Sequence, residues 1–288
     1  VIDVLSESGG MARVFLARDL RLGRRVVVKM IRTGSMDEDK RALFEREARA
    51  TAALKHPNIV TIHAFGFWRD APYMVLEYLS GQSLRERLDD DALPEREAVT
   101  TCIALAKALQ HAHERGVYHR DIKPDNIFLE ETGEVKLLDF GISDFNLDQD
   151  AVREAMEGGG DELLDGTPAV AGTPGFMAPE QWRGQPQDAR TDIWGIGATL
   201  YRALTGECPY PPDVPTRLFT DGVSSLADAH PDAHEKTVDL VDRCLRVDPE
   251  DRLDDADALL DALENLRDAL TGGGDVSGPP YRYLEAFE

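Results

Sequence analysis

The feature that most constrains the fold is a change of sequence pattern near residue 80. Before it, short β-rich segments alternate with one helical segment, and after it apolar residues recur mostly at helical spacing. Apolar runs over residues 26–31 and 73–76 predict buried strands, and residues 37–54 predict a helix. Further helices are predicted over residues 94–113 and 253–270. The chain therefore predicts two unlike parts, one rich in strands and one mainly helical.

Composition argues against several classes of function. The 288 residues carry 32 Lys+Arg against 54 Asp+Glu, a net charge of −22, and such a surface repels nucleic-acid backbones and anionic lipid headgroups. We therefore expect no nucleic acid and no membrane surface among its partners. No apolar run approaches the roughly 20 residues of a membrane-spanning helix, and no signal-like segment opens the chain. Three widely spaced cysteines predict reduced, buried thiols.

The acidity also has a particular composition. Asp outnumbers Glu by 32 to 22, and Arg outnumbers Lys by 25 to 7. Two interpretations stay open. One is a halophilic protein, in which molar salt screens the self-repulsion of many hydrated carboxylates. The other is an ordinary acidic protein from a GC-rich genome.

Two segments show no pattern of regular structure. Residues 142–171 are acidic and turn-rich, and a connection of this length is more often functional than structural. Residues 271–288 include Gly272, Gly273 and Gly274 and predict a flexible tail or linker. The alternative for the tail is docking of its tyrosines on the folded domain. A chain that opens at Val1, already in a strand, is expected to derive from a longer protein.

The run over residues 118–126 carries the clearest chemistry. It reads Tyr-His-Arg-Asp-Ile-Lys-Pro-Asp-Asn and resembles the catalytic loop of eukaryotic-type (Hanks-type) serine/threonine protein kinases. Other motifs of that family occur in the same order, at residues 27–29, 56–60, 139–141, 178–180, 192–195 and 248–252. The resemblance covers about residues 1–270 and is greatest to bacterial and archaeal members, through residues 10–14 and 176–181.

The resemblance implies an α+β protein, the bilobal protein kinase fold. A small β-rich N-lobe with helix C would span residues 1–79, and a larger, mainly helical C-lobe residues 80–270. The implied activity is ATP- and Mg²⁺-dependent transfer of the γ-phosphoryl group to Ser/Thr hydroxyls of proteins, in signalling and in autophosphorylation. Mn²⁺ is the alternative metal. The implied partners are ATP, protein substrates and, for autophosphorylation, a second copy of the chain; the implied location is the cytoplasm, as part of a larger protein or alone.

The residue types in the motifs suit phosphoryl transfer. A phosphoryl group in flight spreads negative charge over its oxygens, so the site must supply cations and geometry. Asp139 and Asn126 are hard oxygen ligands for Mg²⁺. The resemblance implies that Asp121 accepts or orients the proton of the substrate hydroxyl and that Lys123 neutralises the transferring group.

The ATP site would combine one cation with an apolar pocket. Lys29 is expected to bind the α- and β-phosphates, held by a carboxylate of the following helix. Glu47 is the predicted partner, with Glu45 as the second choice. The resemblance implies further contacts with ATP from the glycine-rich loop, the hinge that follows Leu76, and the walls around adenine: Gly9, Gly10, Val14, Val27, Glu77, Leu79 and Phe128.

The substrate side of the site is predicted from Thr173, which would hydrogen-bond Asp121 and Lys123. Thr173, together with Lys123-Pro124, is typical of the serine/threonine class and not of the tyrosine class. Anchors for this segment are predicted at Arg120, Glu180 and Arg252. A small-molecule kinase of related fold is disfavoured, because such enzymes lack the docking segment around residues 172–180.

The sequence departs from the family in the phosphate-covering loop. The three glycine positions of the pattern fall on Glu7, Gly9 and Ala12, so only the middle one is met. Weaker ATP binding is the expected consequence, and a pseudokinase that acts as a nucleotide-binding scaffold is the alternative. An active enzyme is favoured because the four residues most directly tied to the chemistry are all present: Lys29, Asp121, Asn126 and Asp139.

The second departure lies between residues 142 and 171, which contain eight acidic residues and one basic residue, Arg153. Kinases with an Arg before the catalytic Asp commonly need a phosphate on this segment to pair with it. Thr167 is the predicted phosphorylation site. The alternative is that Asp165 already neutralises Arg120. The acidic segment also predicts a preference for basic substrates.

Overall fold

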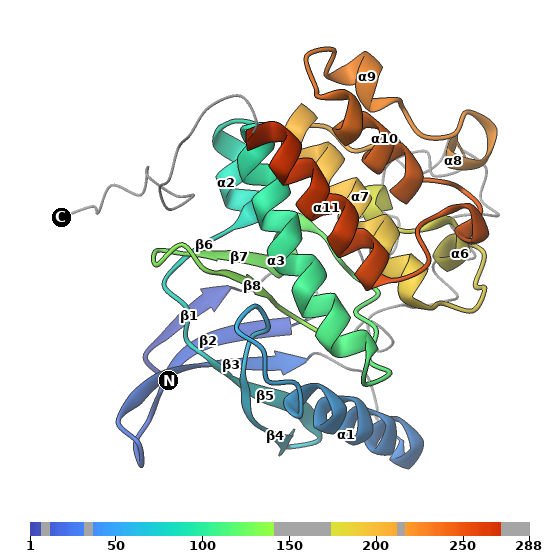
Figure 1. Ribbon diagram of the computed structural model, residues 1–288. Coiled ribbons are helices and arrows are strands. Elements are labelled where there is room, and N and C mark those ends of the chain that lie inside the picture. The colour runs from blue at the N-terminus through green and yellow to red at the C-terminus, as the bar shows by residue number, and fades with distance from the viewer. Residues whose placement is uncertain (7–11, 32–36, 141–173, 212–216, 272–288) are drawn as a thin grey trace, which may run out of the picture.

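The computed structural model describes residues 1–6, 12–31, 37–140, 174–211 and 217–271. The N-terminal part is one antiparallel five-stranded sheet with a helix packed against it (Figure 1). The sheet order is β1-β2-β3-β5-β4. The elements are β1 (Asp3–Ser6), β2 (Ala12–Asp19), β3 (Arg24–Ile31), α1 (Glu38–Ala52), β4 (Ile62–Trp68) and β5 (Ala71–Glu77).

Helix α1 forms where its sequence provides a cap and one apolar face. The Asp37 side chain accepts a hydrogen bond from the Lys40 amide at 2.8 Å, which satisfies one of the free N–H groups of the first turn. Its buried residues are Phe44, Ala48 and Thr51. Phe44 meets Phe67 of β4 edge to face, with ring centroids 5.4 Å apart. This packing attaches α1 to the sheet through a small core of its own.

The remainder of the described chain is mainly helical, with a three-stranded sheet β6-β7-β8 beside the N-terminal part (Figure 1). Its strands and helices, the three 3-10 turns (η) among them, are β6 (Gly81–Ser83), α2 (Leu84–Asp90), α3 (Glu95–His113), η1 (Pro124–Asn126), β7 (Ile127–Glu130), β8 (Val135–Leu137), η2 (Pro174–Phe176), α6 (Pro179–Trp182), α7 (Ala189–Thr205), α8 (Arg217–Thr220), α9 (Leu226–Ala229), α10 (Glu235–Cys244), η3 (Pro249–Asp251) and α11 (Ala256–Thr271).

Helix α7 is the centre of this helical part. It starts at the N-cap Asp188 and ends at Gly206, whose φ of 74° is the left-handed conformation that closes a helix. Nearly all of its residues are buried, which is the pattern of a helix surrounded by protein. Two of its glycines allow close packing: a Cβ at Gly195 would lie 2.8 Å from Ile122 Cβ, and one at Gly197 would lie 2.5 Å from Cys244 Cβ. Helix α7 can therefore lie directly under the loop over residues 118–126.

The two parts are joined by backbone hydrogen bonds as well as by the chain. Val60 N donates to Leu137 O at 3.0 Å, and Leu137 N donates to Asn58 O at 2.9 Å. The Asn58 side chain adds a bond to Val135 O at 2.8 Å. The segment that follows α1 is thus fixed to strand β8, which leads into the candidate site.

The predicted elements are confirmed, with small shifts at their ends. The predicted strands correspond to β3 and β5, and the three predicted helices to α1, α3 and α11. The lobe boundary proposed after residue 79 stays a prediction; β5 ends at Glu77 and β6 begins at Gly81. The predicted tail lies almost wholly outside the described residues. Among the described helices, none is both long and apolar enough to cross a lipid bilayer.

Candidate active site

The loop over residues 118–126 is held from below by a buried carboxylate on α7. Asp192 accepts hydrogen bonds from the backbone amides of His119 and Arg120, at 2.9 and 2.6 Å. His113 Nε2 lies 2.8 Å from the same carboxylate. Burial raises the pKa of Asp192, but the hydrogen bond and charge of His113 outweigh it, so the pKa lies below its ordinary value. The loop is thereby anchored by an ionised group.

Three of the predicted site residues meet on this loop. Lys123 Nζ lies 2.9 and 2.8 Å from the two carboxylate oxygens of Asp121. Asn126 Nδ2 donates to Asp121 O at 2.7 Å and to Asp121 Oδ2 at 2.9 Å. The 3-10 turn η1 brings Asn126 back over Asp121 and makes this arrangement possible. A carboxylate, an ammonium and an amide therefore form one compact group.

Asp139 lies beside the same loop, two residues after the end of β8. Leu138 N donates to Asn126 O at 2.8 Å, which fixes the residue before Asp139 beside the loop. Asp139 has a φ of 61°, a backbone conformation that is uncommon for residues other than glycine and that occurs at functional sites. Its Oδ2 lies 2.6 Å from Lys29 Nζ.

The charge state of Asp139 suits a metal ligand. Burial raises its pKa, but the charge and hydrogen bond of Lys29 outweigh this effect, and the pKa lies below its ordinary value. Because Asn126 uses its Nδ2 toward Asp121, its side-chain oxygen Oδ1 is left for another partner. One carboxylate and one amide oxygen, completed by phosphates and water, form a donor set that fits Mg²⁺. The residues present therefore fit the expected metal.

The predicted partner of Lys29 lies elsewhere in this structure. Glu47 contacts its neighbour Arg46, with Oε1 2.9 Å from Nη2, and Glu45 lies 3.5 Å from Arg49. Between the described side chains of Lys29 and Glu47 there is no ion pair within 4.0 Å, because the ammonium of Lys29 is held by Asp139. The Lys29–Glu47 contact stays a prediction for the nucleotide-bound protein.

The residues predicted around adenine follow the register of the sheet. Val14 of β2 pairs with Lys29, and Val27 pairs with Leu76 of β5. Phe128 on β7 is half-buried, and Leu79 packs on the core of the N-terminal part. Glu77 Oε1 accepts from Thr61 N at 2.8 Å and lies 3.3 Å from Lys136 Nζ. The Glu77 backbone N–H is also engaged, since it donates to Thr61 O at 3.0 Å. The contact of Glu77 with a ligand stays a prediction.

The predicted anchors Glu180 and Arg252 form a buried, bidentate ion pair. Both pairs of atoms, Nη1–Oε1 and Nη2–Oε2, are 2.8 Å apart. Thr191 Oγ1 also donates to Glu180 at 2.8 Å. Burial raises the pKa of Glu180, but the hydrogen bond and charge of Arg252 outweigh it and lower the pKa. The pair ties α6 to the turn before α11.

Several predicted positions lie outside the described residues. These are the loop positions Glu7, Gly9 and Gly10 and the positions Arg153, Asp165, Thr167 and Thr173. Their predicted roles are therefore not tested by this structure.

Residues of the site that pattern reasoning missed act through the backbone. Asp192 stood inside a recognised motif, but its role became visible only from its contacts with His119 and Arg120. Gln181 Oε1 accepts from Ala178 N at 2.9 Å, and its Nε2 donates to Arg120 O at 2.8 Å. The sequence signal for Gln181 was its place at the end of the motif over residues 176–181, which carries no information about its contacts.

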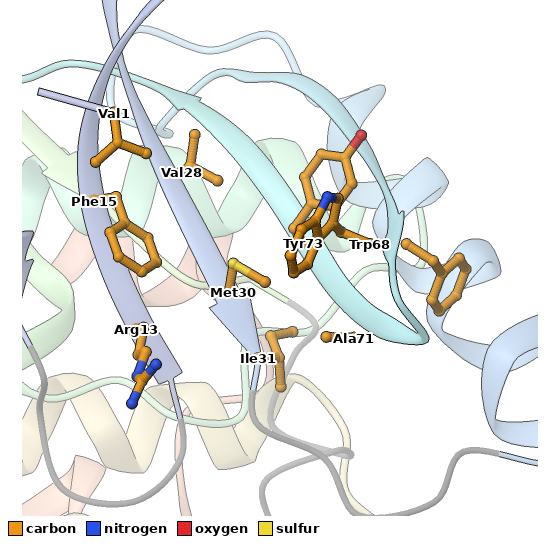
Figure 2. Close-up of a pocket in the computed structure, with 10 residues that line it drawn as sticks. Val1, Arg13, Phe15, Val28, Met30, Ile31, Trp68, Ala71 and Tyr73 are labelled. Atoms are coloured by element: carbon orange, nitrogen blue, oxygen red, sulfur yellow. The ribbon is translucent and has the colours of Figure 1, made fainter.

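A cavity of about 730 Å³ lies on the N-terminal sheet but is not this site (Figure 2). Its lining includes Arg13 and Phe15 of β2 and Val28 and Met30 of β3. Successive residues of a strand point to opposite faces, so the cavity lies on the face opposite to that of Lys29. None of the predicted site residues lines it.

Comparison with known proteins agrees with the fold. The family described as "Protein kinase domain" matches residues 7–262. Serine/threonine-protein kinase PknB of Mycobacterium leprae is 38% identical over 216 residues, which are 73% of this chain and 33% of that protein. Probable serine/threonine-protein kinase SCO3848 of Streptomyces coelicolor is 37% identical over 280 residues, 93% of this chain and 40% of that protein. The chain therefore spans about a third to two fifths of these relatives.

A solved structure shows the same architecture. The crystal structure of the Mycobacterium tuberculosis PknI kinase domain aligns with a TM-score of 0.70 at 24% identity, over 92% of this chain and 94% of that one. The predicted fold class is thus confirmed.

Proposed function

Because this chain belongs to the protein kinase domain family, we propose that it transfers the γ-phosphoryl group of ATP to Ser and Thr hydroxyls of proteins. The observation that carries the proposal is the hydrogen-bonded group of Asp121, Lys123 and Asn126. The ion pair of Asp139 with Lys29 lies beside it, because Leu138 N donates to Asn126 O. The side chains of this group and of the pair come from distant parts of the sequence and supply the cations, metal ligands and proton acceptor that this chemistry needs.

The family implies ATP and a divalent metal, and we propose Mg²⁺, with Mn²⁺ as the alternative. Asn126 and Asp139 would hold the metal, which when bound neutralises charge on the phosphate oxygens. When ATP binds, Lys29 would leave Asp139 and would instead contact the α- and β-phosphates and Glu47. This exchange is favourable because Asp139, once its charge is shared with a metal, no longer needs Lys29 as its counter-ion.

Asp121 and Lys123 would act at the transferred group. Asn126 Nδ2 holds Asp121 in place by hydrogen bonds to its backbone oxygen and to its Oδ2. The remaining lone pairs of the carboxylate can then receive or orient the proton of the substrate hydroxyl. Lys123, 2.8 Å from Asp121, would turn its ammonium to the transferring phosphoryl and offset its charge. Thr173 would support both residues from the docking segment.

The substrate class follows from the relatives and the loop. Both curated relatives described above are named serine/threonine-protein kinases, and Lys123-Pro124 with Thr173 is typical of that class. We propose protein substrates with Ser or Thr acceptors, including a second copy of this chain for phosphorylation at Thr167. The three cysteines are free thiols, which agrees with a proposed location in the reducing cytoplasm, as a domain of a longer protein.

The test is phosphoryl transfer with radiolabelled ATP and a library of Ser-, Thr- and Tyr-containing peptides. Wild type is expected to label Ser and Thr peptides, and Asp121→Asn is expected to lose activity by a factor of about 10² or more, because it lacks the proton acceptor. The matched control is Asp70→Asn, which removes an exposed carboxylate that pairs with Arg41 far from the loop.

The outcomes separate the alternatives. Equal background labelling by wild type and Asp121→Asn would support the nucleotide-binding scaffold instead. Labelling of Tyr peptides alone would contradict the serine/threonine assignment. Mass spectrometry of the same reaction reports whether Thr167 carries phosphate; full activity without phosphate on residues 142–173 would remove the role proposed for Thr167.

A further inference from the structure

Tyr210 is a buried tyrosine on the loop that follows α7, and its hydroxyl is fully engaged. The residue is 1% exposed. Its hydroxyl lies 2.7 Å from Met177 O and also contacts Pro174 O. Trp182 Nε1 donates to the same hydroxyl at 3.2 Å. Three groups of the segment over residues 174–182 thus converge on one side-chain oxygen.

The hydroxyl has a defined role in this arrangement. Tryptophan Nε1 can only donate and a backbone carbonyl can only accept, so the hydroxyl accepts from Trp182 and donates its proton toward the carbonyls. Burial raises the pKa of Tyr210 above its ordinary value, which keeps the proton in place. A phenylalanine would fill the same volume but would leave Met177 O and Trp182 Nε1 buried without these partners.

The peptide group between Met177 and Ala178 is held at both of its polar atoms. Tyr210 binds its carbonyl oxygen, and Gln181 Oε1 accepts from its N–H at 2.9 Å. The other end of the Gln181 amide donates to Arg120 O at 2.8 Å, one residue before Asp121. The two side chains therefore set the position of this peptide relative to the catalytic loop.

The peptide lies in the segment proposed to receive the substrate. The docking segment implied by the family resemblance lies around residues 172–180. Its described part, residues 174–180, begins with η2 (Pro174–Phe176). A shift of the Met177 peptide would move this turn, because Met177 N donates to Pro174 O at 3.2 Å and closes it. None of these contacts involves Lys29 or Asp139.

We propose that Tyr210, supported by Trp182, is a positioning residue that sets the docking segment for the protein substrate. The proposal rests on the proposed kinase function. It assigns to the hydroxyl an effect on binding of the protein substrate and none on binding of ATP. Gln181 links the same peptide to the backbone oxygen of Arg120.

The experiment compares Tyr210→Phe with Tyr201→Phe. Tyr201 is also 1% exposed and lies on α7, and burial raises its pKa, so its variant removes a hydroxyl of the same helical part away from the docking segment. For each protein we would measure the KM for a Ser/Thr peptide, the KM for ATP, the rate of ATP hydrolysis without peptide, and the midpoint of thermal unfolding.

Tyr210→Phe is expected to raise the peptide KM by about three- to tenfold, the worth of one hydrogen bond, with the ATP KM and hydrolysis rate within about twofold of wild type. Tyr201→Phe is expected to leave the peptide KM, the ATP KM and the hydrolysis rate unchanged, even where its unfolding midpoint falls. An unchanged peptide KM in Tyr210→Phe, or an equal rise in both variants, would overturn the proposal.

Two further variants keep the proposal testable. Trp182→Phe removes the donor that orients the Tyr210 hydroxyl and is expected to raise the peptide KM in the same direction. If Tyr210→Phe does not fold, Trp182→Phe decides the matter alone, and its unchanged peptide KM would also contradict the proposal. Failure of the proposed kinase function would be recognised separately, because wild type itself would then transfer no phosphate to peptides.

Discussion

At the residue scale, the site depends on charged side chains whose pKa values follow their partners. Asp139, Asp192 and Glu180 are all buried or mostly buried, and each keeps a lowered pKa because a cation or a backbone amide faces it. Burial alone would have raised all three values. These groups therefore stay ionised, which the proposed metal site, the loop anchor and the ion pair each require.

The Glu180–Arg252 pair provides a test of this description. Replacing Arg252 by Met leaves Glu180 buried without its counter-ion and is expected to cost about 3–5 kcal/mol of unfolding free energy. Replacing both residues, as Glu180→Leu with Arg252→Met, is expected to recover much of that loss, since no uncompensated charge remains. Denaturant unfolding of the two variants and wild type measures this, and an equal loss in both would contradict it.

The same pair predicts the direction of a pH effect. Because the folded-state pKa of Glu180 is lowered, its contribution to stability is present above the unfolded pKa and is lost as pH falls through the folded pKa. Wild type should therefore lose more stability on acidification below the ordinary pKa of a glutamate than Glu180→Gln does. Identical slopes for the two proteins over that acidic range would exclude the assignment.

At the element scale, α7 positions the site by its closeness to two neighbours. Two of its glycines face the loop over residues 118–126 and α10, so closely that a Cβ on either glycine would clash with its neighbour. Asp192, on the same helix, accepts the amides of the loop. The helix is thus both the core of the helical part and the support of the loop that carries Asp121.

Two alanine substitutions on α7 separate these roles. Gly197→Ala places a Cβ 2.5 Å from Cys244 Cβ, and Gly195→Ala places one 2.8 Å from Ile122 Cβ. Each is expected to cost about 1–3 kcal/mol through overpacking, despite the better helix propensity of alanine. Only Gly195→Ala is expected to lower kcat, because Ile122 adjoins Asp121. Thermal unfolding and peptide kinetics test this, and equal kcat losses in both variants would refute it.

At the scale of the whole molecule, the net charge is divided unequally. Residues 1–79 hold 13 Lys+Arg and 10 Asp+Glu, a net of +3, whereas residues 80–288 hold 19 and 44, a net of −25. Part of the excess lies near η3 and α11, where Arg190 binds Glu250 at 2.8 Å and Asp254 at 3.0 Å. The remaining carboxylates of the helical part repel one another across its surface.

This repulsion predicts the response to salt. Raising the salt concentration to about 1 M shortens the screening length to about 3 Å. The unfolding midpoint is therefore expected to rise by about 2–4 °C, which corresponds to about 1 kcal/mol for a domain of this size. An uncharged osmolyte at equal osmolality serves as the control. An equal rise in both solutions, or none in salt, would contradict a role for charge repulsion. The halophilic interpretation itself stays open.

Much of the architecture follows from local pattern. The apolar run in β3, the capped amphipathic α1 and the apolar face of α3 are read from residues that are neighbours in sequence, because strand and helix patterns are local properties. The site residues Lys29, Asp121, Asn126 and Asp139 were likewise identifiable, since their order and spacing match a known family. Glu47 was chosen in the same way, but spacing could not show that Lys29 would pair with Asp139 instead.

The sequence by itself thus determined the fold class, the two unlike parts and the side chains proposed to carry the chemistry. Only the tertiary structure decided which partner each side chain takes. Tyr210 meets the Met177 carbonyl, Gln181 the Arg120 carbonyl and Asp192 two loop amides. The physical reason is that a hydrogen bond to a backbone group requires a position and a direction but no particular residue type on the other side. Such contacts leave no pattern in the sequence, and they become visible only when distant segments are packed together.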